Sequence, residues 1–153
     1  MLAAKRPTGI RAPPATNCRA IERPITVVDN TYLLTFVLVV LATKHVVFDF
    51  FLQTLYQRKN KGIYGHPGGL LHSAGHALGT GCIFLVIRPS LLVAVSIILG
   101  EFVVHYHIDW CKEQIGDRMK WGPQQNAYWR AIGIDQWLHQ LTYVGIALVL
   151  ATM

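Results

Sequence analysis

The chain has 153 residues, of which 52% are hydrophobic and only 14% are charged. A soluble domain usually carries about a quarter of charged residues, so this composition indicates a polytopic membrane protein. The formal net charge is +6, but the basic residues flank apolar segments and do not form a basic face with interleaved aromatic residues. That distribution is typical of membrane loops, and we expect the lipid bilayer as a partner and no nucleic acid.

The first segment, residues 1–30, is basic and rich in proline. It has no apolar stretch of the kind found in a secretory signal, so it is not one. We predict an N-terminal arm over 1–30 that is flexible or bound to another membrane subunit. A four-helix transmembrane domain is predicted to follow over 31–153.

Four apolar segments make up that domain, and a span of the bilayer needs about 20 residues. Only Arg88 and Pro89 separate the second segment from the third, which implies an antiparallel hairpin. Lys112 to Asn126 is predicted to be a polar loop. We predict an all-α polytopic membrane protein, a four-helix bundle of two antiparallel hairpins with both termini on one side. The segments run from about 32 to 56, 70 to 87, 90 to 110 and 128 to 153.

Each apolar segment contains two polar residues that are four positions apart, so on a helix they share one face. Ionisable groups are costly in hydrocarbon and normally face the interior of a bundle, a partner or a cavity. In an antiparallel bundle all four pairs fall in one layer, in the half of the membrane bordered by the loops after the first and third segments. We therefore expect one shared cluster. The pairs are His45/Asp49, His72/His76, His105/Asp109 and Asp135/His139.

Five imidazoles and three carboxylates in one layer are suitable ligands for a transition metal. Helix bundles build metal centres from inward residues at helical spacing. We expect all eight residues to be candidates for a divalent metal site, with zinc as the metal, and a hydrolase-like use of that site. Three alternatives stay open: a haem held by two histidines, which the carboxylates make less suitable; a proton relay; and pairs that only hold the bundle together in a non-enzymatic subunit of a larger membrane complex.

The order of these motifs resembles an uncharacterised membrane protein family of bacteria and phages, domain of unknown function 3307. The shared pattern is H-x3-D-F-x-L-Q, then HA-x2-HA, then H-x3-D, then DQ-x2-H, over about residues 33–150. The chain departs from it at Ser73, where the family often has alanine, and in its basic arm. The resemblance implies a small integral membrane protein, which we place in the bacterial inner membrane, and it implies no activity.

Overall fold

The structure is a computed structural model, and it describes residues 27–153. Within that range every regular element is helical and there is no strand. The predicted arm lies outside the described residues up to residue 26, and the first helix begins at Val27. The elements are α1 (Val27–Val46), the π-helix η1 (Val47–Leu52), α2 (Leu55–Asn60), α3 (Pro67–Thr80), the 3-10 helix η2 (Gly81–Ile83), α4 (Phe84–Ile87), α5 (Leu91–Met119) and α6 (Asn126–Ala151).

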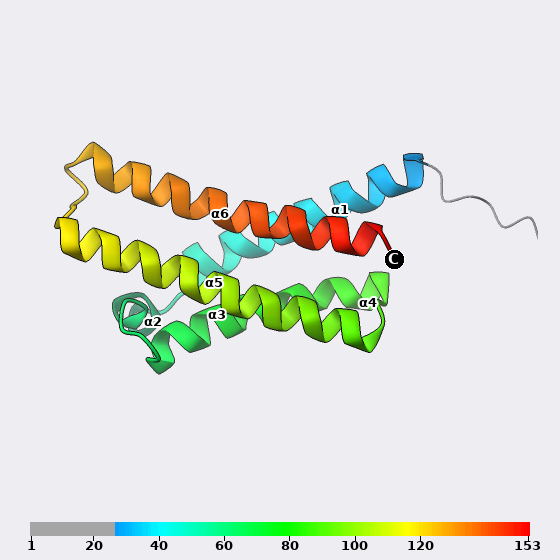
Figure 1. The fold of residues 1–153 in the computed structure, drawn as a ribbon, viewed down its shortest axis with the longest axis horizontal. Coiled ribbons are helices and arrows are strands. Elements are labelled where there is room, and N and C mark those ends of the chain that lie inside the picture. The colour runs from blue at the N-terminus through cyan, green and yellow to red at the C-terminus, as the bar shows by residue number, and fades with distance from the viewer. Residues whose placement is uncertain (1–26) are drawn as a thin grey trace, which may run out of the picture.

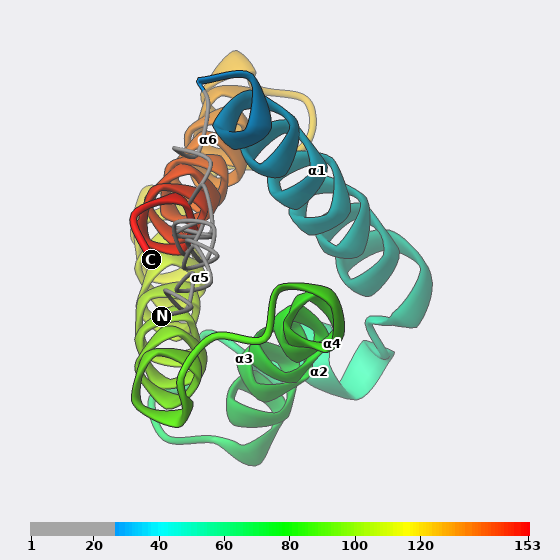
Figure 2. The same cartoon turned by 90° about the vertical axis from the view of Figure 1, so that its right-hand side faces the viewer.

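The long helices pack in a ring, each against two neighbours. Helix α1 packs against α6, α6 against α5, and α5 against α3, while α3 returns to α1 through a smaller contact. Seen end-on in Figure 2, these helices follow one another around the molecule, and the short α2 lies beside α3. The tight turn predicted at Arg88 and Pro89 is present, because α4 ends at Ile87 and α5 starts at Leu91 at the same end of the molecule (Figure 1).

Three helical segments are long and apolar enough to cross a membrane: Asn30–Leu52, Pro67–Ile87 and Leu91–Met119. Large apolar side chains on them face outward, and Leu85 and Leu91 are 78% and 80% exposed. Helix α6 is not among the three, because the polar residues in its first half lower its hydropathy. An all-helical fold over residues 27–153, with helices of membrane-spanning length and composition, is thus confirmed.

The polar loop predicted from Lys112 to Asn126 is wrong over its first half. Helix α5 continues to Met119, nine residues beyond the predicted end at Trp110. Lysine, glutamate and glutamine are good helix formers, so a polar composition there did not indicate a loop. The amide of Gln114 also donates to the carbonyl oxygen of Gly62 at 2.6 Å, which holds this part of α5 against the segment after α2. His105 and Asp109 consequently lie in the middle of α5 and not in its last turns.

The apolar core occupies one end of the molecule. It joins the second half of α1, the start of α5 and the last turns of α6, and its buried members include Val37, Leu41, Ile97, Tyr143 and Leu150. The polar pairs lie beyond this core, toward α2 and the ends of α1 and α5. The fold therefore separates an apolar half from a half whose interior is polar.

Two glycines on α3 allow α1 and η1 to approach closely. A Cβ added at Gly75 would lie 3.2 Å from Phe48, and one added at Gly79 would lie 3.1 Å from both Lys44 and Phe48. The two glycines are four residues apart, which is the small-residue spacing that favours close helix approach. The approach brings the end of α1 against the face of α3 that carries His72 and His76.

We expect Gly79→Leu to lower the free energy of unfolding by about 1–3 kcal/mol, because a larger side chain must displace Lys44 and Phe48 from a packed interface. Gly100→Leu is the matched control, since a Cβ at Gly100 meets nothing within 4 Å. Unfolding in detergent with a rising fraction of sodium dodecyl sulfate measures both. Equal losses for the two variants would contradict the close approach.

Candidate metal centre

The eight residues singled out by helical spacing come together in the polar half of the molecule. Seven of them are buried, and the eighth, Asp49, has a side chain that is 13% exposed. The histidine rings contact one another directly. Ring centroids are 4.0 Å apart for His76 and His105, 4.2 Å for His105 and His139, and 4.9 Å for His45 and His139.

The first set of metal-donor atoms comes from η1, α3 and α5. Its members are Asp49, His72, His76 and His105, and one ligand atom from each lies within 4.8 Å of the others. Asp49 Oδ1 is 3.1 Å from His76 Nε2 and 3.3 Å from His72 Nε2. His72 Nε2 is in turn 3.3 Å from His105 Nε2. Three imidazoles and one carboxylate oxygen thus face a common point.

A second donor set comprises His105, Asp109 and His139, again with ligand atoms within 4.8 Å of one another. His105 belongs to both sets, so the two sets have one ligand residue in common. The Nδ1 atom of His139 is 2.8 Å from the carbonyl oxygen of Asp135, which fixes the ring. Among the described residues, His139 Nε2 and His105 Nδ1 are buried without any hydrogen-bond partner. Buried polar atoms are normally satisfied, so these two nitrogens are candidates to bind a ligand.

The π-helix η1 explains how Asp49 reaches the cluster. Short π-helical turns are frequent at functional sites, because the widened turn re-aims side chains. Here the turn begins directly after α1 and ends where Gln53 becomes extended. Asp49 Oδ2 contacts His45 Nε2 at 3.1 Å, and the Gln53 amide lies 3.3 Å from the His72 ring. The prediction of one continuous helix from 32 to 56 did not include this change of helix type.

Two of the eight predicted residues lie outside both donor sets. His45 Nδ1 is 2.9 Å from the Tyr143 hydroxyl, and His45 Nε2 is 3.0 Å from the side-chain oxygen of Gln136. Asp135 accepts a hydrogen bond from the Gln136 amide at 3.1 Å. These contacts make His45 and Asp135 neighbours that orient donor residues, in the way that carboxylates and carbonyls usually support metal-binding histidines.

Sequence reasoning missed two contributors to the cluster. Lys61 is buried directly after α2, and its ammonium donates to Asp109 Oδ1 at 3.2 Å. Tyr143 is also buried and contacts His45, about two turns after Asp135 on α6. Tyr143 follows His139 by four residues, so helical spacing places it on the face of Asp135 and His139. Lys61 has no such signal, because its contact depends on how the segments pack. Conversely, His107 is exposed, and its contacts among the described residues are with its own helix and with Tyr64, so it lies outside the cluster.

A buried ion pair lies one layer deeper, next to the apolar core. The ammonium of Lys44 is paired with the carboxylate of Glu101, and it also donates to Thr80 Oγ1 at 2.9 Å and to the carbonyl oxygen of His76 at 3.0 Å. It lies 4.7 Å from the centroid of the Tyr143 ring. The buried ammonium therefore has a counter-charge and two further acceptors within the protein.

The Nε2 atom of His72 has more close polar neighbours than it can hydrogen-bond. Its Nε2 atom lies 3.3 Å from Asp49 Oδ1, 3.2 Å from Asp109 Oδ2 and 3.3 Å from His105 Nε2. One ring nitrogen carries at most one proton and donates along one direction. The remaining close approaches cannot all be hydrogen bonds, whereas a cation could be coordinated by several of these atoms at once.

One of three comparisons with known proteins gave a match, and that match covers most of the helical region. Curated proteins and solved structures gave no match to the chain. A family profile described as "Protein of unknown function (DUF3307)" matches residues 36–153, a range that contains all eight predicted site residues. The motifs from His45 to His139 had indicated the same family. Because the match spans well over half of the sequence, the chain belongs to the DUF3307 family.

Proposed function

We propose that this protein is an integral membrane four-helix bundle whose His/Asp cluster binds a divalent metal ion, with zinc as the metal. The observation that carries the proposal is the pair of donor sets that share His105. Tetrahedral ligands at roughly 2.0–2.1 Å from zinc lie about 3.4 Å from one another. The separations of 3.1 Å between Asp49 and His76 and of 3.3 Å between His72 and His105 are close to that spacing.

The direct contacts between rings favour a metal ion over haem. A haem bound by two histidines needs the space of its macrocycle between them. Here the ring centroids of His72 and His76 are 4.7 Å apart, and those of His76 and His105 are 4.0 Å apart. The carboxylates of Asp49 and Asp109 add hard donor atoms, which suit zinc when they are combined with imidazole.

Helix α6 is proposed as the fourth span, which gives two antiparallel hairpins with both termini on one side. Its polar side chains Asp135 and His139 are buried in the cluster, while Trp137 and Leu148 on it are 59% and 54% exposed. A helix that turns its polar residues inward and its apolar residues outward is suited to lipid. We place the protein in the bacterial inner membrane, with the loops after η1 and α5 on the cytoplasmic side, because they carry more basic residues.

The function proposed for this centre is metal-dependent hydrolysis. A divalent ion there would supply Lewis-acid activation of water. The residues of the chain would hold the ion through the two donor sets and keep their rings oriented through His45, Gln136 and the Asp135 carbonyl. The buried Lys61 beside Asp109 adds positive charge near the site, which suits a substrate whose charge becomes more negative during reaction.

The test is elemental analysis of protein purified in detergent, and we expect about one zinc ion per chain at pH 7.5. Protons compete with metal for imidazole, so zinc content should fall as the pH is lowered through about 6 and should return when the pH is raised again with zinc present. Circular dichroism at each pH separates metal loss from unfolding. Substoichiometric metal at pH 7.5 in folded protein would contradict the proposal and favour the non-enzymatic subunit.

A further inference from the structure

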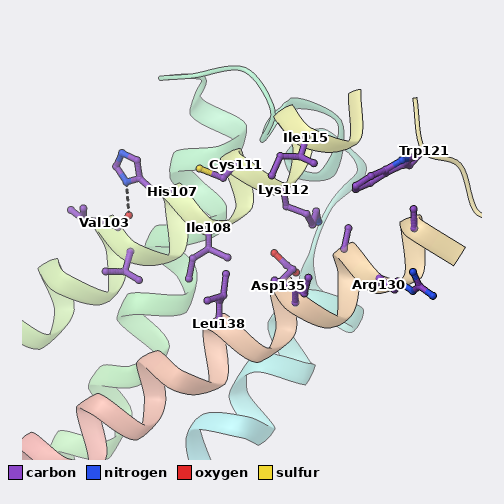
Figure 3. Close-up of a pocket in the computed structure, with 14 residues that line it drawn as sticks. Val103, His107, Ile108, Cys111, Lys112, Ile115, Trp121, Arg130, Asp135 and Leu138 are labelled. Atoms are coloured by element: carbon purple, nitrogen blue, oxygen red, sulfur yellow. Dashed lines mark hydrogen bonds between the residues drawn. The ribbon is translucent and has the colours of Figure 1, made fainter. Parts of the chain in front are cut away.

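An apolar groove runs between α5 and α6 and ends at basic residues. Its volume is about 890 Å³, which lies within the range of about 300–1,000 Å³ typical of ligand pockets. Figure 3 shows Ile108 and Leu138 facing each other across it, with Lys112, Trp121 and Arg130 toward the end of the groove near the α5–α6 loop. The other apolar residues that line it are Val103, Val104, Ile115, Ala127, Ala131 and Ile134.

A smaller polar pocket adjoins this groove. Its volume is about 290 Å³, and Lys112, Trp121 and Ala131 line both spaces. Arg58 and Lys61 line the polar pocket as well, and so does Gln53. Glu113 and Asp117 line the polar pocket too. The two spaces together therefore have an apolar part and a charged part that meet at Lys112 and Trp121.

Both spaces border the His/Asp cluster. Asp135 lines the groove although it is only 5% exposed, and its Oδ1 atom has no hydrogen-bond partner among the described residues. Its carboxylate projects from α6 toward α5 in Figure 3. On the polar side, Gln53 contacts His72 and Lys61 contacts Asp109. A molecule that occupied both spaces would thus lie beside the candidate metal centre.

The basic residues at the junction are not fully neutralised within the chain. Lys112 pairs with Glu113 at 3.1 Å, and Lys61 pairs with Asp109. Across the part of the chain that the structure describes, Arg58 and Arg130 form no ion pair, and both are exposed. The carboxylates that line the two spaces are those of Glu113, Asp117 and Asp135, against the four basic side chains. The formal charge of the lining residues is therefore net positive by one, with both arginines unpaired, which is complementary to an amphiphile with an anionic head.

We propose that the groove and the polar pocket bind a phospholipid with an anionic headgroup, its chains between α5 and α6 and its headgroup at Lys112, Arg130 and Arg58. This rests on the proposed function and names its substrate class. A soluble anion would leave the apolar groove unused, and a zwitterionic lipid would leave the arginines without a net negative partner. A free fatty acid would place only a carboxylate in the polar pocket.

Tryptophan quenching in vesicles tests the proposal, because Trp121 lies where the two spaces meet. A variant with Trp110, Trp129 and Trp137 changed to phenylalanine leaves Trp121 as the single reporter. Vesicles contain equal amounts of phosphatidylglycerol and phosphatidylcholine, with brominated chains on one lipid or on the other. We expect stronger quenching when phosphatidylglycerol is brominated, because each basic residue beside the headgroup raises the occupancy of the site by an anionic lipid about fivefold.

The variant Lys112→Gln/Arg130→Gln should lose this preference. Arg118→Gln is the matched control and should keep it, because Arg118 is an exposed cation on the same helix that lines neither space. Equal quenching by both brominated lipids would overturn the proposal. An equal loss of preference in the control variant would also overturn it, because it would show general attraction to the membrane surface.

Two further measurements separate the outcomes. Displacement of brominated phosphatidylglycerol by oleate as effectively as by unlabelled phosphatidylglycerol would assign the site to a fatty acid and overturn the phospholipid. Should the reporter variant fail to fold, native mass spectrometry of wild-type protein gives the ratio of the two lipids retained, with a ratio of one overturning the proposal. Zinc content of the same samples shows which proposal fails. Bound zinc without a lipid preference would contradict only the proposed lipid site, and a lipid preference without bound zinc would contradict only the proposed metal centre.

Discussion

The variant His105→Ala is expected to lose nearly all of its bound metal. His105 is the residue common to both donor sets, so its removal takes one ligand from each at the same time. Loss of a residue that merely supports a metal ligand typically weakens binding by about 10–100-fold, and loss of a direct ligand should exceed that. Elemental analysis after passage over a chelating resin measures retained zinc, and competition with a chromophoric chelator measures the change in affinity.

His107→Ala is the matched control for this variant. It removes an imidazole from the same helix two positions away, but His107 is exposed and belongs to neither donor set. It should retain wild-type zinc. His45→Ala should give an intermediate loss, since His45 contacts Asp49 without belonging to a set. If His105→Ala keeps its zinc, or if the control loses as much, the metal is not held where we propose.

The variant Lys44→Met is expected to lower the free energy of unfolding by about 3–5 kcal/mol, the usual cost of removing one partner from a buried ion pair. The side chains of Lys44 and Glu101 are only 6% and 0% exposed. Without the ammonium, the Glu101 carboxylate has no counter-charge, and Thr80 loses a hydrogen bond of 2.9 Å. Unfolding in mixed detergent and sodium dodecyl sulfate measures the loss.

The double variant Lys44→Met/Glu101→Leu distinguishes charge from packing. Replacing both partners by apolar residues of similar size is often neutral or stabilising, so most of the lost stability should return. Lys59→Met is the control, because Lys59 is an exposed lysine on α2 and should change stability by less than about 0.5 kcal/mol. If the double variant is as unstable as Lys44→Met, the loss comes from packing and the ion pair contributes little.

Local information in the sequence was sufficient to predict the helical class and the polar cluster. A spacing of four places two side chains on one helix face wherever the helix packs, and the cost of placing imidazole or carboxylate in an apolar environment turns that face inward. His72 and His76 on α3 illustrate this, since both are buried and both belong to one donor set. The order of the same motifs was specific enough to identify the family.

Packing between helices decided which of the candidate residues join a donor set and which lie beside it. Asp49 joins the first donor set because a π-helical turn follows α1, and His45 is left to contact Tyr143 and Gln136 instead. The burial of Lys61 beside Asp109 likewise depends on a contact between segments far apart in the chain. Helical periodicity describes the direction of a side chain about its own axis. It carries no information on which partner helix lies opposite, so the division of eight candidates into donors and neighbours is set by the tertiary structure alone.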